Sequence, residues 1–372
     1  MSESNASQRV ASAPRVGPFT VFLVVLAAIA LLLLAAEGAV RVRQTMKYGS
    51  ADRIEDAWTV DRRLDLRVPV ANYSNGRISV NSLGFRGPEI AMPKPPHTVR
   101  IAYLGASTTW CAEVSGNESV WPHLATASLA DAFPGTRFDY VNAGVPGYTM
   151  PSILVNLENR VAPLQPDVIV IYEAANMLSG EMRERAEKAG IIEKRDVEVS
   201  SFPSRYSLLW YLVEKNLRLK AAQRNVESNR HLLEVDANSL GSEYRKALTQ
   251  VVVAAQRSAK LVAVATFAIQ PRAGQSREQQ MRASESALFY MPFVTPQTII
   301  DSYAQYNRIM REVAAEKGVL LIEGENDIPG DAVHFTDSVH FSDAGSALMA
   351  RRISAALIVS PALREIVAAS GS

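Results

Sequence analysis

The chain contains the stretch Val99-Arg100-Ile101-Ala102-Tyr103-Leu104-Gly105-Ala106-Ser107-Thr108-Thr109. A short, mainly apolar run without polar alternation is typical of a strand that is buried on both faces of a parallel sheet. Gly105 follows this run, and Ser107 is the first hydroxyl-bearing residue beyond it. A serine that leaves a buried strand is a candidate nucleophile.

Four more apolar runs follow, and helical stretches separate them. The expected strands are Val99–Leu104, Phe138–Asn142, Val168–Tyr172, Leu261–Phe267 and Val319–Ile322. The expected helices are Val120–Asp131, Pro151–Val161, Ser242–Ser258, Ser302–Lys317 and Asp343–Ile358. This alternation predicts an α/β fold, a three-layer α/β/α sandwich with a parallel sheet. Residues 178–240 and 270–298 interrupt the alternation, and we expect the second stretch to be loop-like.

Polar residues follow several of the predicted strands. Ser107, Gly147 and Asn176 each lie just past a strand end, and a turn with Asp337 and His340 follows the last strand. Ligands of parallel sheets bind at the carboxyl ends of the strands, so we expect these residues to converge. A serine, a histidine and an aspartate that holds the histidine are the groups that acyl transfer requires.

In these residues the chain resembles the SGNH (GDSL-like) hydrolase superfamily over roughly residues 98–360. The four sequence blocks of that superfamily appear in order. They are Gly105-Ala106-Ser107-Thr108, Val141 to Thr149, Ala174-Ala175-Asn176-Met177 and Asp337-Ser338-Val339-His340. The resemblance implies a flavodoxin-like sheet.

The resemblance also implies a role for each matching residue. Ser107 is the expected nucleophile, His340 the base and Asp337 the residue that orients it. The backbone N–H groups of Ser107 and Gly147 and the Asn176 side chain are the expected oxyanion donors. Such donors stabilise the tetrahedral intermediate by roughly 3 kcal/mol each in measured cases.

The sequence leaves two alternatives open. Gly144 competes with Gly147 as the glycine donor, and Asp331-Ala332-Val333-His334 repeats the Asp-x-x-His spacing six residues before the preferred pair. We favour Asp337 and His340 because a helix with small residues follows them directly. Ala106, Ala174 and Met177 depart from the superfamily pattern without touching the reactive groups.

The expected activity is that of a serine ester hydrolase that removes short acyl groups, foremost O-acetyl from cell-envelope or exported polysaccharide. Three rivals remain at this stage: an O-acyltransferase that uses the same triad, a non-catalytic glycan-binding or scaffold subunit, and a lipase. An acylated carbohydrate or another small ester is the expected partner.

The N-terminal part contains an apolar segment, Phe19 to Ala36, in which Thr20 is the only polar residue. A helix of this length spans about 27 Å, close to the thickness of the bilayer core. We expect a transmembrane signal anchor over 18–40, a disordered cytoplasmic segment over 1–17 and a linker with a small β-containing extension over 41–97. The hydrolase-like domain is expected over 98–360, outside the cytoplasm, followed by a C-terminal tail over 361–372. The flanking charges do not decide the orientation.

The composition limits the remaining classes. The formal net charge of the 372-residue chain is +1, which gives no reason to expect nucleic-acid binding. Cys111 is the only cysteine, so an intrachain disulfide and a cysteine-based zinc site are excluded. The histidines show no metal-ligand spacing, and we expect neither a metal nor another cofactor.

Overall fold

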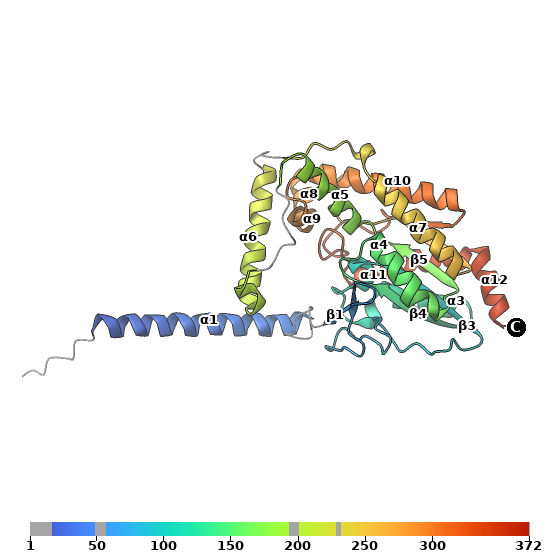
Figure 1. Ribbon diagram of the computed structural model, residues 1–372, viewed down its shortest axis with the longest axis horizontal. Helices are drawn as coiled ribbons and strands as arrows, with labels where there is room; N and C mark the ends of the chain where they lie inside the picture. The colour runs from blue at the N-terminus through green and yellow to red at the C-terminus, as the bar shows by residue number, and fades with distance from the viewer. Residues whose placement is uncertain (1–16, 49–56, 193–200, 228–231, 372) are drawn as a thin grey trace, which may run out of the picture.

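The computed structural model describes residues 17–48, 57–192, 201–227 and 232–371. Its centre is a five-stranded parallel sheet with the strand order β4-β3-β5-β6-β7 (Figure 1). The strands are β3 (Thr98–Gly105), β4 (Arg137–Gly144), β5 (Val168–Tyr172), β6 (Leu261–Ala265) and β7 (Leu320–Ile322). This is the flavodoxin-like order, in which the second strand of the sheet lies outside the first. The predicted fold class is confirmed.

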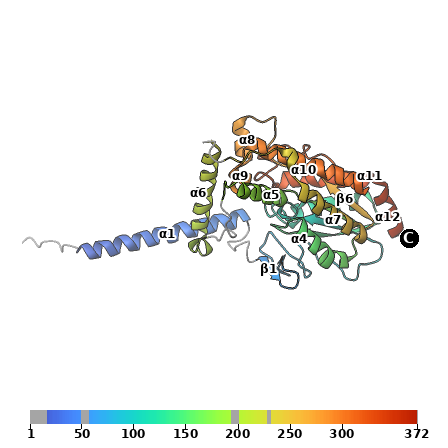
Figure 2. The ribbon, with the colours of Figure 1, turned by 45° about the horizontal axis from the view of Figure 1, so that its top comes forward.

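Helices cover both faces of the sheet (Figures 1 and 2). On one face α3 (Trp121–Ala132) packs against α11 (Asp343–Val359). On the other, α7 (Ser242–Ser258) packs against both α4 (Met150–Asn156) and α10 (Pro296–Lys317). Strands joined through helices in this way form right-handed crossovers, which bring every strand's carboxyl end to the same edge.

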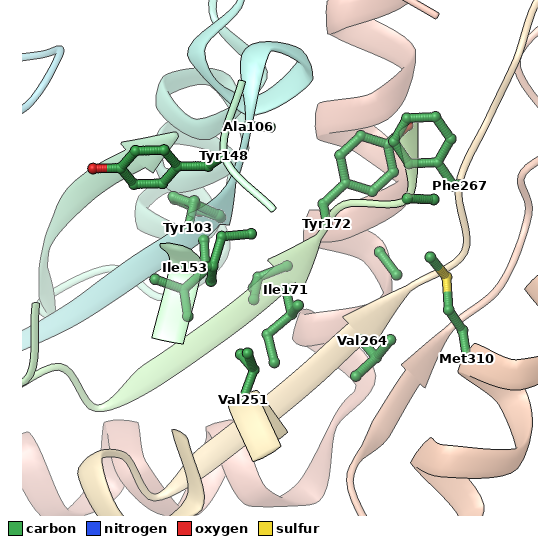
Figure 3. Close-up of a cluster of buried hydrophobic side chains, with 14 of the residues drawn as sticks. Tyr103, Ala106, Tyr148, Ile153, Ile171, Tyr172, Val251, Val264, Phe267 and Met310 are labelled. Atoms are coloured by element: carbon green, nitrogen blue, oxygen red, sulfur yellow. The ribbon is translucent and has the colours of Figure 1, made fainter. Parts of the chain in front are cut away.

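The core lies between the sheet and these helices. Figure 3 shows Ile153 of α4, Val251 of α7 and Met310 of α10 beside Ile171 and Val264 of the two central strands. All five side chains are at most 1% exposed. Strands that are apolar on both faces, as β3, β5 and β6 are, require helices on both sides, which explains why the continuous apolar runs predicted the layers.

The segment before the sheet forms a small extension that packs on the main domain. It contains an antiparallel pair, β1 (Trp58–Asp61) and β2 (Leu66–Pro69). Arg86 of the extension is completely buried, and its guanidinium donates to the carbonyl oxygens of Trp110 and Cys111 at 2.7 and 2.5 Å. The extension therefore supports the backbone that follows Ser107.

Several element boundaries differ from the expectation. Helix α10 starts at Pro296 rather than Ser302, because the Thr295 side chain caps it and proline fits the first helical turn. Residues 270–298 are not loop-like throughout: they contain α8 (Arg277–Ala283) and α9 (Glu285–Tyr290). Ser276 and Gln279 form a capping box at the start of α8, a sequence signal for a helix that we did not use.

The ends of the chain also differ. Residues 361–371, expected as a tail, form α12 (Pro361–Gly371), which packs against α11 and β3 and buries Leu363 and Ile366. At the N-terminus, α1 (Pro18–Tyr48) contains one stretch that is long and apolar enough to cross a membrane, a property that a signal sequence shares. The expected disorder over 1–17 lies, apart from Gly17, outside the described residues.

Candidate active site

Ser107 is the first residue of α2 (Ser107–Trp110), a single helical turn that follows β3 directly. Asn176 lies in the first turn of α5 (Ala175–Lys188), which follows the neighbouring strand β5. In the strand order of this sheet, the connection reverses direction between β3 and β5. Such a switch point opens a crevice at the carboxyl ends of the strands, where α/β proteins bind their ligands.

Three of the predicted site residues form one hydrogen-bonded chain. The Nε2 atom of His340 lies 2.8 Å from Ser107 Oγ, and its Nδ1 atom lies 2.8 Å from Asp337 Oδ2. The other carboxylate oxygen of Asp337 accepts the backbone N–H groups of Val339 and His340. This is the arrangement in which an imidazole takes the hydroxyl proton while the carboxylate fixes its tautomer.

The turn that carries His340 is held by α9. Ser338, two residues before His340, is 2% exposed. Its backbone N–H donates to Ser286 Oγ at 3.0 Å, and its own Oγ accepts the backbone N–H of Ala287 at 3.1 Å. Gln270 N–H donates to the Ser338 carbonyl at 2.8 Å. The position of the base therefore depends on the segment that we expected to be a loop.

Neighbouring charges shift the pKa values of Asp337 and His340 in the direction opposite to the shift that burial causes. Burial favours the neutral forms, but the charge of His340 and three hydrogen bonds lower the pKa of Asp337 to about 2. Burial also acts against a protonated His340, yet the nearby carboxylates of Glu113 and Asp337 raise its pKa to about 9. The surroundings thus favour the protonated form of His340.

Side chains from three other elements hold the carbonyl oxygens of α2. A single turn leaves these oxygens without intrahelical partners. Trp121 Nε1 donates to Thr108 O at 3.0 Å, and Asn142 Nδ2 donates to Thr109 O at 2.9 Å. Arg86 binds the next two carbonyl oxygens, as described above. Asn142 thus supports the turn.

A close approach between α2 and β4 requires Gly144. A Cβ atom at this position would lie 2.5 Å from the backbone nitrogen of Trp110. The N–H of Gly144 already donates to the Asn142 side chain at 3.1 Å. Gly144 is therefore occupied as a structural residue, which removes it as the competitor for the oxyanion donor.

The other glycine is free to donate. Gly147 has a φ of +86°, a backbone conformation that favours glycine, and it is exposed. The part of the chain that the structure describes provides no hydrogen-bond acceptor for its N–H. Asn176 Nδ2 donates to the carbonyl of Tyr148, the next residue, at 2.8 Å, so the two predicted donor loops are joined.

Two further carboxyl groups, those of Glu113 and Glu173, act on the charge of His340 and were not predicted from the sequence. Glu173 is 1% exposed, its Oε1 accepts the Asn176 backbone N–H at 2.7 Å, and its Oε2 has no hydrogen-bond partner. Burial raises its pKa to about 8, although backbone hydrogen bonds from α5 oppose the shift. Glu113 has a buried Oε2 atom that is also unpartnered, and burial raises its pKa. An acidic residue directly after the apolar strand Val168–Tyr172 was a usable signal for Glu173.

We expect Glu113→Gln to change the pH dependence of hydrolysis. Only neutral His340 can accept the serine proton, so kcat/KM for a neutral ester should rise with pH through the pKa of His340. The charges of three carboxyl groups, Glu113, Asp337 and Glu173, raise the pKa of this imidazole. Removing the charge of Glu113 should lower the pKa of His340 and move the rise toward lower pH. The pH profiles of the two proteins, measured with p-nitrophenyl acetate, test this, and superimposable profiles would refute it.

The alternative pair, Asp331 and His334, has the same local geometry. His334 Nδ1 lies 2.8 Å from Asp331 Oδ1, which also accepts the backbone N–H groups of Val333 and His334. The hydrogen bond of Ser107, however, is made to His340. The Asp-x-x-His spacing therefore produces the same local contact in both pairs. The hydrogen bond to Ser107 distinguishes Asp337 and His340 from Asp331 and His334.

Comparison with known proteins identifies the family. The model of the GDSL-like lipase/acylhydrolase family matches residues 103–348, which include all the site residues discussed above. No curated protein matches the chain. The chain is similar to three solved structures. One is an α/β hydrolase from the metagenome of Lake Arreo in Spain, at 20% identity, a TM-score of 0.41, and coverage of 69% of this chain and 94% of the other.

Two esterases are similar to the same degree. An acetyl xylan esterase matches at 17% identity and a TM-score of 0.41, over 69% of this chain and 99% of the other. The acetylxylan esterase of Geobacillus stearothermophilus matches at 17% identity and a TM-score of 0.42, over 72% and 96%. Because these TM-scores lie below 0.5, the assignment depends on the family model, which covers well over half of the sequence. The chain belongs to the GDSL-like lipase/acylhydrolase family and is a hydrolase that acts on ester bonds.

Proposed function

We propose that the chain is a serine esterase that removes short acyl groups, acetyl foremost, from polysaccharide at a cell envelope. The hydrogen bond between Ser107 Oγ and His340 Nε2, at 2.8 Å, is the observation that carries the catalytic part of this proposal. It provides an unactivated hydroxyl with a base within proton-transfer distance.

The proposed reaction has two steps. Ser107 Oγ attacks the ester carbonyl carbon while its proton passes to His340, and the negative oxygen is held by the N–H groups of Ser107 and Gly147 and the Asn176 amide. Collapse of this intermediate breaks the ester bond, and His340 protonates the departing sugar oxygen. A water molecule then gives its proton to His340, attacks the acyl carbon and releases the carboxylic acid with regeneration of Ser107. Asp337 holds the imidazole throughout.

The location is the second part of the proposal. We propose that α1 anchors the chain in a membrane and that the domain from Thr98 to Gly371 lies outside the cytoplasm. The apolar segment of α1, Phe19 to Ala36, is long enough for the bilayer core, and none of it is buried against the rest of the protein. An esterase held there meets exported and surface glycans that carry acyl esters.

Product analysis with the full chain in detergent tests the function. We expect acetate release from acetylated xylan and from p-nitrophenyl acetate, with rates that fall as the acyl chain of the nitrophenyl ester grows. Faster hydrolysis of long-chain esters would instead favour a lipase. Transfer of acetyl to an added glycan in preference to water would favour an acyltransferase. The absence of any turnover with the nitrophenyl esters would contradict the esterase proposal itself.

A further inference from the structure

Helix α6 (Leu208–Glu227) carries an exposed apolar stripe. Tyr206, Trp210, Val213 and Leu217 are 69, 49, 42 and 63% exposed. The spacing of three and four residues places Trp210, Val213 and Leu217 on one side of α6, and Tyr206 precedes the helix by two residues. Phe202, which is 73% exposed, packs against the Tyr206 ring with centroids 5.2 Å apart and extends the stripe. Exposed aromatic side chains gathered in this way indicate an interaction surface.

The N-terminus of α6 is fastened to α1. The Glu37 carboxylate accepts the backbone N–H groups of Leu208 and Leu209 at 3.0 and 2.9 Å and the Ser207 hydroxyl at 2.9 Å. Arg41 donates to the same carboxylate at 2.8 Å. A carboxylate at this position satisfies orphan backbone donors and the positive end of the helix dipole. Glu37 directly follows the apolar segment of α1, so α6 begins where that segment ends.

The direction of α6 differs from that of α1. In Figures 1 and 2, α6 lies across α1, with the apolar N-terminal half of α1 on one side of it and the sheet domain on the other. A helix that lies across a membrane-spanning helix at the end of its apolar segment runs along the membrane surface. The face of α6 toward the domain packs against α9, and the stripe residues remain uncovered by this contact.

We propose that α6 lies in the headgroup region of the bilayer that α1 spans, with Tyr206, Trp210, Val213 and Leu217 facing the lipid. This inference rests on the anchoring part of the proposed function. The chemistry fits a lipid surface: tyrosine and tryptophan favour the membrane interface, where the ring is in an apolar environment and its polar atom stays hydrated. Four basic residues, Lys215, Arg218, Lys220 and Arg224, lie along the same helix, and Arg218 is paired with Glu214. Basic side chains near an interfacial helix attract anionic lipid headgroups.

The same helix connects the membrane surface to the proposed catalytic turn. Helix α6 packs against α9, and α9 makes the two hydrogen bonds to Ser338 described above. A domain held by α1 alone would rotate and tilt freely about a single connection. The second contact, through α6, fixes the orientation of the domain. The sheet edge that carries Ser107 and His340 therefore keeps one position relative to the bilayer.

Fluorescence quenching by labelled lipids tests this inference in the full chain. The protein is reconstituted in vesicles of phosphatidylcholine and phosphatidylglycerol that contain a doxyl-labelled lipid, with the label either near the headgroup or near the end of the acyl chain. The wild type is compared with Trp210→Phe, which keeps an aromatic ring in place. The control, Trp58→Phe, removes a half-buried indole of the extension.

We expect the fluorescence that Trp210 contributes, the difference between wild type and Trp210→Phe, to be quenched strongly by the label near the headgroup and weakly by the deep label. An interfacial helix inserts only about 5–10 Å into the bilayer. Trp58→Phe should leave the lipid-dependent quenching of the protein unchanged.

Three outcomes would overturn the proposal, and they are distinguishable. Equal quenching of wild type and Trp210→Phe in vesicles that carry the protein would place α6 away from the lipid. A Trp210 shielded from both the labelled lipid and aqueous acrylamide would mean that another protein surface covers the stripe. Failure of the chain to float with vesicles in a density gradient would reject the anchor and the α6 contact together. Hydrolysis of p-nitrophenyl acetate by the same samples reports on the esterase proposal independently.

Discussion

Replacing Ser107 by alanine is expected to lower kcat/KM for p-nitrophenyl acetate by at least about 10⁴-fold, which corresponds to about 5.4 kcal/mol of transition-state stabilisation. The hydroxyl that His340 contacts at 2.8 Å is the only group lost in this variant. The remaining oxyanion donors, Gly147 N–H and the Asn176 amide, would still assist direct attack by water, so a small residual rate should persist.

Ser115→Ala is the matched control for this variant. Ser115 lies eight residues further along the chain and is exposed, and among the described residues its hydroxyl hydrogen-bonds to Ser119 at 2.8 Å. Its removal should change the rate less than twofold, because surface changes of this kind have small effects. If Ser107→Ala retained a tenth or more of the wild-type kcat/KM while remaining folded, the proposed mechanism would be wrong.

The second large effect is expected for His340→Asn, again a loss of about 10⁴-fold or more in kcat/KM. Without the imidazole nothing accepts the Ser107 proton as the oxygen attacks, so the hydroxyl stays a poor nucleophile. Asparagine has a similar size and can keep a hydrogen bond to Asp337, which limits disturbance of the turn. Initial rates with saturating and sub-saturating ester separate kcat from KM, and kcat should carry most of the loss.

The chain supplies its own control in His334→Asn. His334 contacts Asp331 at 2.8 Å, the distance that also separates His340 from Asp337, and it belongs to the same Asp-x-x-His spacing. Since the serine is bonded to His340, His334→Asn should leave kcat/KM within a few fold of the wild type. A large loss in His334→Asn together with a small loss in His340→Asn would reverse the assignment.

The central sheet was predictable from the sequence because burial on both faces demands uninterrupted apolar strands. Val168–Tyr172 is a strand with the predicted limits, and Val99–Leu104 differs from β3 by one residue at each end. The order of the strands was expected only from the resemblance to the SGNH superfamily, which implies a flavodoxin-like sheet. Prediction failed where helices are short or begin with a cap: α8 has seven residues and α9 has six, too few for a clear apolar period.

The grouping of Ser107, Asp337 and His340 could be predicted because it depends on sequence motifs and on which strand each residue follows. The environment of the His340 imidazole could not be predicted, because it depends on residues that come together only in the folded chain. Glu113 follows Ser107 by six residues in a stretch without a recognisable period, and nothing in that stretch indicates that its carboxyl is near His340. Burial, which raises the pKa of Glu173 to about 8, is likewise a tertiary property.

The role of α6 illustrates the same limit. The aromatic residues Tyr206, Trp210 and Tyr211 are visible in the sequence, but their spacing does not indicate what they contact. Only the contact between Glu37 and the start of α6, which joins segments about 170 residues apart, shows where the stripe lies relative to the apolar helix. Long-range contacts of this kind leave no local pattern in the sequence.

Covalent labelling by a fluorophosphonate is the most direct test of the central claim that Ser107 is a nucleophile activated by His340. In the labelling reaction the serine oxygen bonds to phosphorus, fluoride leaves and the serine proton passes to the base. The account predicts one adduct, located by mass spectrometry on the peptide that contains Ser107, formed in parallel with the loss of esterase activity and far more slowly in His340→Asn. An adduct on another residue, or full esterase activity in protein whose Ser107 is completely labelled, would contradict it.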